Sequence, residues 1–461
     1  MLNKDITTYS SIFSKHYSEL RVQENRSINI TLLNGDVVSN DCSSKSGVSS
    51  RTFKNGNWGF SSSPNISDNA IESVISSSVD NVNFLTKRDD RVCGILLPEA
   101  SISNEFDYTS KNDKNDQKYW IEYLKDLDEY IKSKYPKVTS RTLVLSALDM
   151  EKNLLTATGS TSFSMTPRSH LIIVLTAELK GSSIRLMDAH GGLGQLQDNF
   201  SNPNEYYKKI DEQVKQLMDK VNGVHAKAGR KEVVLDGDLA GILAHEAIGH
   251  TTEADLVLGG SVAGDNINNK VASKLISLVD YANSAFGKIC PVPVFVDDEG
   301  VESKDVKIIE NGILKSFMHN KDSSRHFNAK LTGNARAFSF ADEPLIRMRN
   351  TAILPGDSKL MDMISSVEDG YYLTKTGNGQ ADSTSEFMFA VTMGYEIKNG
   401  KLGRAIFDTT ISGIAFDMLK TVSMVSDEMK WESAGMCRKK QPIPVGMGGP
   451  AIKCEINIGG R

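Results

Sequence analysis

Asparagine-glycine pairs recur between short apolar segments, and they constrain the fold of this chain more than any other local feature. Such pairs occur at residues 34–35, 55–56, 311–312 and 399–400, and a Gly-Asn-Gly triplet stands at 377–379. Asparagine followed by glycine readily adopts the positive φ angles of tight hairpins, so each pair predicts a reversal between two antiparallel strands. We therefore expect much antiparallel sheet, especially in the C-terminal half.

Three segments have the spacing of an amphipathic helix instead. These helices are expected around residues 71–79, 120–131 and 203–222. Between the second and the third, residues 141–185 predict an antiparallel meander with a turn near residues 151–153. The first half therefore mixes helices with strands.

The chain has 461 residues, which is too many for one ordinary hydrophobic core, so we expect two domains. With the junction in segment 223–231, residues 1–225 form an N-terminal α/β domain. Residues 226–461 form a β-rich, largely antiparallel C-terminal domain. In this second domain we expect a short helix near residues 239–250 and an amphipathic stretch at 271–281. The predicted fold class is α+β.

Composition argues against several classes of function. The 53 Lys and Arg residues against 58 Asp and Glu leave a net charge of −5, which offers no basic excess for nucleic acid. The longest apolar runs are far shorter than the ~20 residues that span a bilayer, and the N-terminus lacks the apolar stretch of a secretion signal. The five cysteines form no disulfide framework: Cys42, Cys93, Cys290, Cys437 and Cys454. We expect a cytoplasmic protein that binds neither nucleic acid nor membrane.

Two histidines and a glutamate within six residues form the most informative segment. His245, Glu246 and His250 lie among small or apolar residues, in a chain with only eight histidines. Histidines four residues apart share one helix face and can bind one zinc ion, as in the pattern His-Glu-x-x-His. A spacing of five places the two side chains ~140° apart on a regular helix. A π-bulge, or a helix end at His250, would remove the conflict, and Gly249 is well placed to permit either.

The spacing alone leaves two interpretations open. In the first, the histidines are unrelated, one exposed and one hydrogen-bonded in the core. In the second they bind a metal, which needs a third ligand from a cysteine, aspartate or glutamate. Glu253 and Asp255 lie close by, either as ligands or as acceptors for imidazole N–H groups. Cys437 and Cys454 are the remote thiolates in the β-rich half.

Beyond this motif, most of the chain resembles the TldD/PmbA family of metallopeptidases, specifically its TldD-like branch. Residues 245–255 are similar to the family's His-Glu-x-x-x-His helix and the acidic pair that follows it. Other similar blocks occur in the family's order at residues 56–60, 297–300, 310–315, 332–336, 347–351, 355–356, 436–437 and 442–450.

The resemblance implies a zinc-dependent peptidase. His245, His250 and Cys437 would bind one Zn²⁺ per active chain, and an open fourth position would hold a water molecule with Glu246 as its general base. It also implies small peptides as substrates, and exposed sheet edges in the β-rich half favour short or unfolded peptides that add as a strand. The implied assembly is a dimer, either of identical chains or with a catalytically silent paralogue.

Two rival functions deserve comparison with this one. The chain could be a silent structural or regulatory subunit of a peptidase complex, or its zinc site could be structural and closed by Asp255 or Cys454. Intact Glu246 argues against the silent subunit, because a purely structural zinc site needs no base, whereas the closed structural site stays open as an alternative. His319 and Asn334 are oxyanion-stabiliser candidates by residue type alone. The basic run 438–440 is expected to be a solvated loop, with contact to substrate carboxylates as the alternative.

Overall fold

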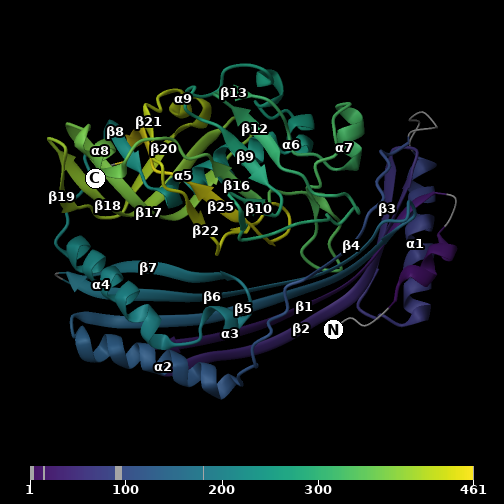
Figure 1. The fold of residues 1–461 in the computed structure, drawn as a ribbon, viewed down its shortest axis with the longest axis horizontal. Helices are drawn as coiled ribbons and strands as arrows, with labels where there is room; N and C mark the ends of the chain where they lie inside the picture. The colour runs from purple at the N-terminus through teal and green to yellow at the C-terminus, as the bar shows by residue number, and fades with distance from the viewer. Residues whose placement is uncertain (1–4, 14–15, 89–95, 180, 460–461) are drawn as a thin grey trace.

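The computed structural model describes residues 5–13, 16–88, 96–179 and 181–459, so Cys93 lies outside the described residues. A long sheet built from the first half of the chain lies opposite a second body that contains two further sheets (Figure 1). Within the described ranges, no helix is long and apolar enough to cross a membrane.

The long sheet has seven strands in the order β3-β2-β1-β5-β6-β4, with β7 paired to β6. Asn34-Gly35 and Asn55-Gly56 form the predicted hairpin turns, and all four residues have positive φ angles. The strands are β1 (Tyr17–Leu33), β2 (Asp36–Lys54), β3 (Asn57–Ser63), β4 (Ser103–Asp107), β5 (Val138–Thr156), β6 (Thr161–Leu179) and β7 (Ser182–Leu193).

The turn predicted near residues 151–153 is wrong, because β5 runs straight through it. The polar residues that suggested a turn have partners across the sheet and on the opposite body. Glu151 pairs with Arg26 of β1 at 2.7 Å, and Lys152 reaches Asp298 at 2.7 Å. Polarity at this point therefore indicates contact between the two halves rather than a surface loop.

All three predicted helices of the first half are confirmed. α1 (Asp68–Thr86) packs against β2 and β3, and Ser67 caps it by accepting from the Ala70 N–H. α2 (Gln117–Lys134) and α4 (Tyr207–Val221) cover the sheet face that points away from the second body (Figure 1). Shorter helical segments are Thr7–Ile12, α3 (Leu196–Asn199) and Pro203–Tyr206.

The second body contains one sheet ordered β17-β8-β26-β20-β18-β19, with β21 on β26, and another ordered β13-β12-β9-β16-β25-β22. The first comprises β8 (Gly229–Leu235), β17 (Asp369–Ala381), β18 (Glu386–Lys398), β19 (Lys401–Ala405), β20 (Thr409–Ile414), β21 (Met424–Val425) and β26 (Ile452–Ile458). The second comprises β9 (Leu278–Tyr281), β12 (Val306–Glu310), β13 (Ile313–Leu314), β16 (Asn350–Ile353), β22 (Lys430–Glu432) and β25 (Gly446–Gly449).

Short helices and two-stranded pairs connect these sheets. The helices α5 (Gly237–Leu243), α6 (Ala254–Leu258), α7 (Lys321–His326), α8 (Leu360–Ser365) and α9 (Ala415–Lys420) each have seven residues or fewer, and Gly264–Asn266 forms a 3₁₀ turn. The pairs are β10 (Ser284–Ala285) with β11 (Lys288–Ile289), β14 (Ala335–Arg336) with β15 (Leu345–Ile346), and β23 (Met436–Cys437) with β24 (Ile443–Pro444).

This arrangement confirms the predicted α+β class, because most of the ladders in the second body are antiparallel. Turns at Asn311-Gly312 and Asn399-Gly400 are confirmed. The turn predicted at residues 377–379 is wrong: these residues lie inside β17, where the register against β18 shifts. The helix expected at 271–281 is also wrong. Its apolar residues reach the core from an extended segment that ends in β9.

Candidate metal centre

The histidine segment begins as helix α5 and continues as one π-helical turn, residues 244–249. The His250 N–H donates to the carbonyl of His245, which is the i to i+5 bond of a π-helix. The wider turn brings the ring centroids of His245 and His250 to 5.2 Å. This confirms that a π-bulge resolves the five-residue spacing.

Gly249 contributes space rather than conformational freedom. Its φ of −55° and ψ of −53° are helical values that any residue adopts. A Cβ at this position would lie 2.0 Å from the Met348 sulfur, so only glycine lets the π-turn pack this closely. The predicted importance of Gly249 therefore has a different physical cause from the one expected.

Cys437 reaches the histidines from β23, nearly two hundred residues further along the chain. Its Sγ lies 3.3 Å from His250 Nε2. One ligand atom from each of His245, His250 and Cys437 lies within 4.8 Å of the others, and among the described residues this group contains no further Cys, Asp or Glu. The structure thus brings together the three predicted ligands.

Arg347 holds the cysteine segment in place. This fully buried guanidinium donates to the carbonyl of Cys437 at 2.9 Å and to the carbonyls of Lys439 and Gln441 at 3.1 and 2.8 Å. Three bonds from one planar group leave this loop little freedom. Sequence analysis did not single out Arg347, because its role depends on carbonyl groups ninety residues away.

The donor set fits a zinc ion. His245 is fully buried, and neither of its ring nitrogens has a hydrogen-bond partner, which is costly unless one of them binds a ligand. Burial opposes ionisation of Cys437, but its interactions with the His245 and His250 rings outweigh burial and lower the pKa of the thiol to about 3. Two imidazoles and a thiolate form a ligand set typical of zinc.

Glu253 lies behind His250 rather than among the ligand atoms. Its buried carboxylate lies 2.7 Å from His250 Nδ1, which leaves Nε2 directed at Cys437. Carboxylates in this position orient metal-binding histidines and fix their tautomer. Of the two roles considered for Glu253, the geometry therefore supports that of acceptor.

Lys439 corrects the expectation of a solvated basic loop at residues 438–440. Its side chain is only 11% exposed and pairs with Asp255 at 2.7 Å and Glu253 at 3.3 Å. Arg438 and Lys440 are exposed. Because Asp255 is bound by Lys439 and lies outside the ligand group, it does not close the fourth position.

Glu246 follows His245 directly and lies at the same centre. Its carboxylate comes within 3.7 Å of His250 Nε2, and its side chain is 29% exposed, whereas His245 is fully buried. A carboxylate beside the ligand atoms and open to solvent can accept a proton from a water molecule.

The other sequence candidates lie in the core. Cys454 is buried in β26, and burial raises the pKa of its thiol to about 12. The His319 ring bonds to Ser323, and burial lowers its pKa to about 4. Asn334 donates to Asp280 and to the Arg347 carbonyl. Cys454 lies outside the ligand group, and the side chains of the two oxyanion candidates, His319 and Asn334, are engaged in these core hydrogen bonds.

Comparison with known proteins gives consistent results. Residues 228–460 match the model of the PmbA/TldA metallopeptidase C-terminal domain, and residues 18–82 match domain 1 of the same family. A zinc metalloprotease TldD homolog from Saccharolobus solfataricus is 31% identical over 90% of each chain. A metalloprotease from Methanocaldococcus jannaschii is 30% identical over 96% of each chain.

The fold also has a counterpart of known structure. The crystal structure of TldE from Thermococcus kodakarensis superimposes with a TM-score of 0.76 over 99% of each chain, at 18% identity. The sequence matches define the class, a metallopeptidase family whose C-terminal domain and domain 1 are both matched. The chain belongs to the TldD/PmbA metallopeptidase family.

Proposed function

We propose that this chain is a zinc-dependent peptidase that hydrolyses short or unfolded peptides. The observation that carries the proposal is the convergence of His245, His250 and Cys437, with Glu246 beside them and more open to solvent. The names of the metalloprotease relatives support the same class of reaction.

His245, His250 and Cys437 would hold one zinc ion, which when bound supplies a Lewis acid for a peptide carbonyl and favours ionisation of water. Glu246 accepts the proton of the attacking water molecule and then delivers it to the leaving amine. Glu253 keeps the His250 ring oriented through Nδ1, and Arg347 keeps Cys437 within reach.

Replacing Glu246 with Gln tests this assignment. The amide cannot act as a base but preserves size and leaves the three ligands in place. We expect peptide turnover to fall by at least about 10²-fold, the lower range for loss of a general base, while bound zinc stays near one per chain. Wild-type turnover in this variant would contradict the role of Glu246.

The zinc content of the purified protein should be measured before turnover is assayed. Wild type purified without chelator is expected to carry about one zinc ion per chain, and Cys437→Ser much less, since serine lacks the thiolate. Cys454→Ser is the matched control and should retain the metal. Failure of wild type to bind zinc after reconstitution would favour a silent structural or regulatory subunit.

The proposal includes a dimer and a reducing compartment. Cys42, Cys290, Cys437 and Cys454 are free thiols in the described structure, which supports action in the cytoplasm. Light scattering on the purified chain distinguishes a homodimer from a monomer that awaits a silent paralogue.

A further inference from the structure

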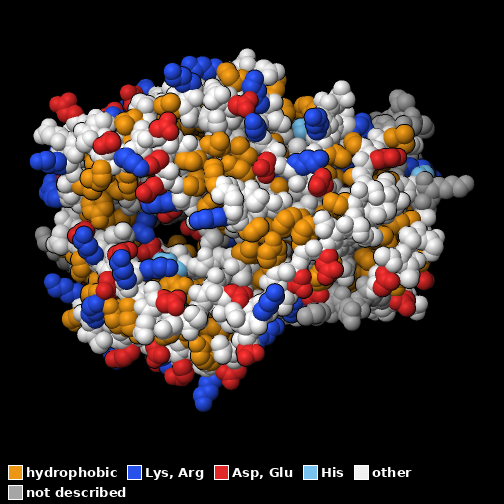
Figure 2. Space-filling model, in the orientation of Figure 1, with side chains coloured by type: hydrophobic (Ala, Val, Ile, Leu, Met, Phe, Trp, Pro, Cys, Tyr) orange, Lys and Arg blue, Asp and Glu red, His pale blue; other side chains and the backbone are white. Residues whose placement is uncertain are grey.

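A cavity of about 550 Å³ lies between the long sheet and the second body. Its floor consists of β1, β2, β5 and β6, and its other wall includes Phe338, Ser339, Ala434 and Met436. The volume falls within the range of small-ligand sites. The molecular surface is also hollowed between the two halves, with basic and acidic side chains around the opening (Figure 2).

The charged side chains of this cavity are all of one sign. Arg168 and Lys45 line it together with His170, and among the described residues in its wall there is no Asp or Glu. Burial, followed by the charge of Arg168, lowers the pKa of His170 to about 4, so this ring is neutral near pH 7. The cavity therefore presents two cations and a neutral imidazole, with no acidic side chain among its described lining residues.

Arg168 is the more unusual of the two cations. It is 4% exposed, and its Nη2 donates a hydrogen bond to the Ser433 carbonyl. Among the described residues its Nε has no hydrogen-bond partner, and the carboxylate whose charge acts on the guanidinium, that of Glu432, forms no hydrogen bond with it. The Nε2 of His170 is also buried and unpartnered. A buried guanidinium that keeps an unpartnered Nε and has no direct ion pair can still bind an anion in the adjoining cavity.

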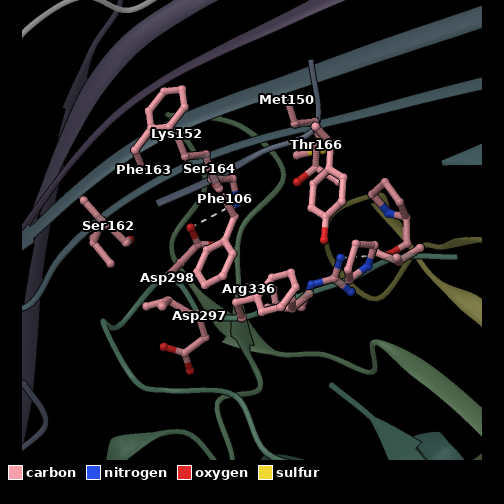
Figure 3. A pocket seen from close by; sticks show the side chains of 18 of the residues that line it. Phe106, Met150, Lys152, Ser162, Phe163, Ser164, Thr166, Asp297, Asp298 and Arg336 are labelled. Atoms are coloured by element: carbon pink, nitrogen blue, oxygen red, sulfur yellow. Dashed lines mark hydrogen bonds and ion pairs between the residues drawn. The ribbon is translucent and has the colours of Figure 1, made fainter. Parts of the chain in front are cut away.

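An adjacent pocket provides the contrast. Figure 3 shows Lys152 of β5 directed at Asp298, which neutralises it at 2.7 Å. Arg168 borders this pocket as well, but Asp298 does not pair with it. The interface between the two halves thus supplies a direct ion pair for Lys152, whereas Arg168 has only the more distant charge of Glu432.

The cavity is connected to the metal centre through the chain. Arg168 bonds to Ser433, Met436 lines the cavity, and Cys437 follows directly. Ser433 and Cys437 are four positions apart in the sequence, so their Cα atoms lie at most about 14 Å apart. That distance is spanned by about four residues of an extended peptide.

We propose that this cavity binds a carboxylate of the peptide substrate through Arg168, with His170 and Lys45 beside it. The inference rests on the proposed peptidase function and names a feature of its substrate. Arginine suits the role because its planar group can bind a carboxylate with two hydrogen bonds. The carboxylate is either the C-terminus of a peptide, which would direct cleavage to within a few residues of that end, or an acidic side chain.

The experiment measures binding of fluorescent peptides to Glu246→Gln, because this readout does not depend on turnover. Three peptides share one sequence and differ at the carboxylate: a free C-terminus, a C-terminal amide, and an amide with one internal Gln changed to Glu. We expect the free acid to bind roughly 10- to 100-fold more tightly than the plain amide. Recovery of affinity by the Glu peptide instead assigns the cavity to a side-chain carboxylate.

The same titrations are then repeated with Arg168→Gln added to Glu246→Gln. The preference for a carboxylate should disappear while zinc content is retained, and the exposed Arg185→Gln serves as the matched control. Lys45→Gln should reduce the preference for a carboxylate without altering the hydrogen bond between Arg168 and Ser433. Equal affinity for all three peptides, or an equal loss for all three in Arg168→Gln, would overturn the inference. Absence of turnover in wild type alongside an intact preference would refute the peptidase function alone.

Discussion

Three side chains near the metal centre position the ligands without belonging to the ligand group. Glu253 accepts from His250, Lys439 pairs with Glu253, and Arg347 bonds to the carbonyl of Cys437. Each is largely buried, so none of these interactions is weakened by solvent in the way that surface ion pairs are. At the scale of single residues, affinity for the metal is therefore expected to depend on side chains that never touch it.

Glu253→Ala tests this dependence. The change removes the acceptor that orients His250. It also leaves Lys439 with one carboxylate fewer to pair with. Losses of this kind typically weaken metal binding by about 10- to 100-fold. Competition with a chelating dye measures the zinc affinity directly. Glu302→Ala, at an exposed site that pairs only with Lys304, is the control and should bind zinc like wild type.

At the scale of the element, the π-turn of residues 244–249 allows two histidines that are five residues apart to face the same site. It requires close packing against the segment that carries Met348, which is completely buried. A methyl group on Gly249 has no room unless that side chain moves. The π-turn and the segment that carries Met348 are therefore expected to be energetically coupled.

Gly249→Ala is expected to destabilise the protein by about 1–3 kcal/mol, the usual cost of overpacking a core. Denaturant unfolding measures the free energy of unfolding, and the zinc titration reports any displacement of His250. Met348→Ala in the same chain should make room for the new methyl group. If the effects of the two substitutions on the free energy of unfolding are strictly additive, the contact with Met348 is not the reason for glycine at this position.

At the scale of the whole molecule, buried charges join the long sheet to the second body. Arg51 of β2 pairs with Glu19 of β1 at 2.9 Å and with Glu299 of the second body at 2.6 Å. Glu299 also accepts from the Lys321 backbone N–H at 2.7 Å and is fully buried. This contact contributes to how the two halves are held around the cavity.

Glu299→Gln should therefore destabilise the protein strongly, by about 3–5 kcal/mol, because it leaves a buried guanidinium with less compensation. The midpoint of urea unfolding gives this difference. Glu302→Gln lies three residues away with its side chain 61% exposed, and we expect a change within about 0.5 kcal/mol. Similar midpoints for the two variants would show that the ion pairs across the interface contribute little.

Local sequence patterns were sufficient to predict the structure of segments whose conformation depends mainly on their own residues. The three helices of the first half, the Asn-Gly hairpins and the α+β class follow from side-chain spacing and turn chemistry. The spacing of the two histidines required either a π-bulge or a helix end at His250, and the structure has the π-bulge. The grouping of Cys437 with the histidines was expected from family resemblance rather than from spacing.

Tertiary structure decided the features that depend on partners distant in the sequence. The polar residues at 151–152 continue a strand because Arg26 and Asp298 satisfy them, and Lys439 is buried because Glu253 and Asp255 meet it. No acidic side chain of the described residues lines the cavity beside Arg168, and only the assembled cavity makes this visible. The amino-acid sequence by itself determined the local elements and the kinds of ligand, because these depend on neighbours within a few residues. The fold alone decided which buried charges are paired directly and which are not, because burial and distance exist only once the two halves have met.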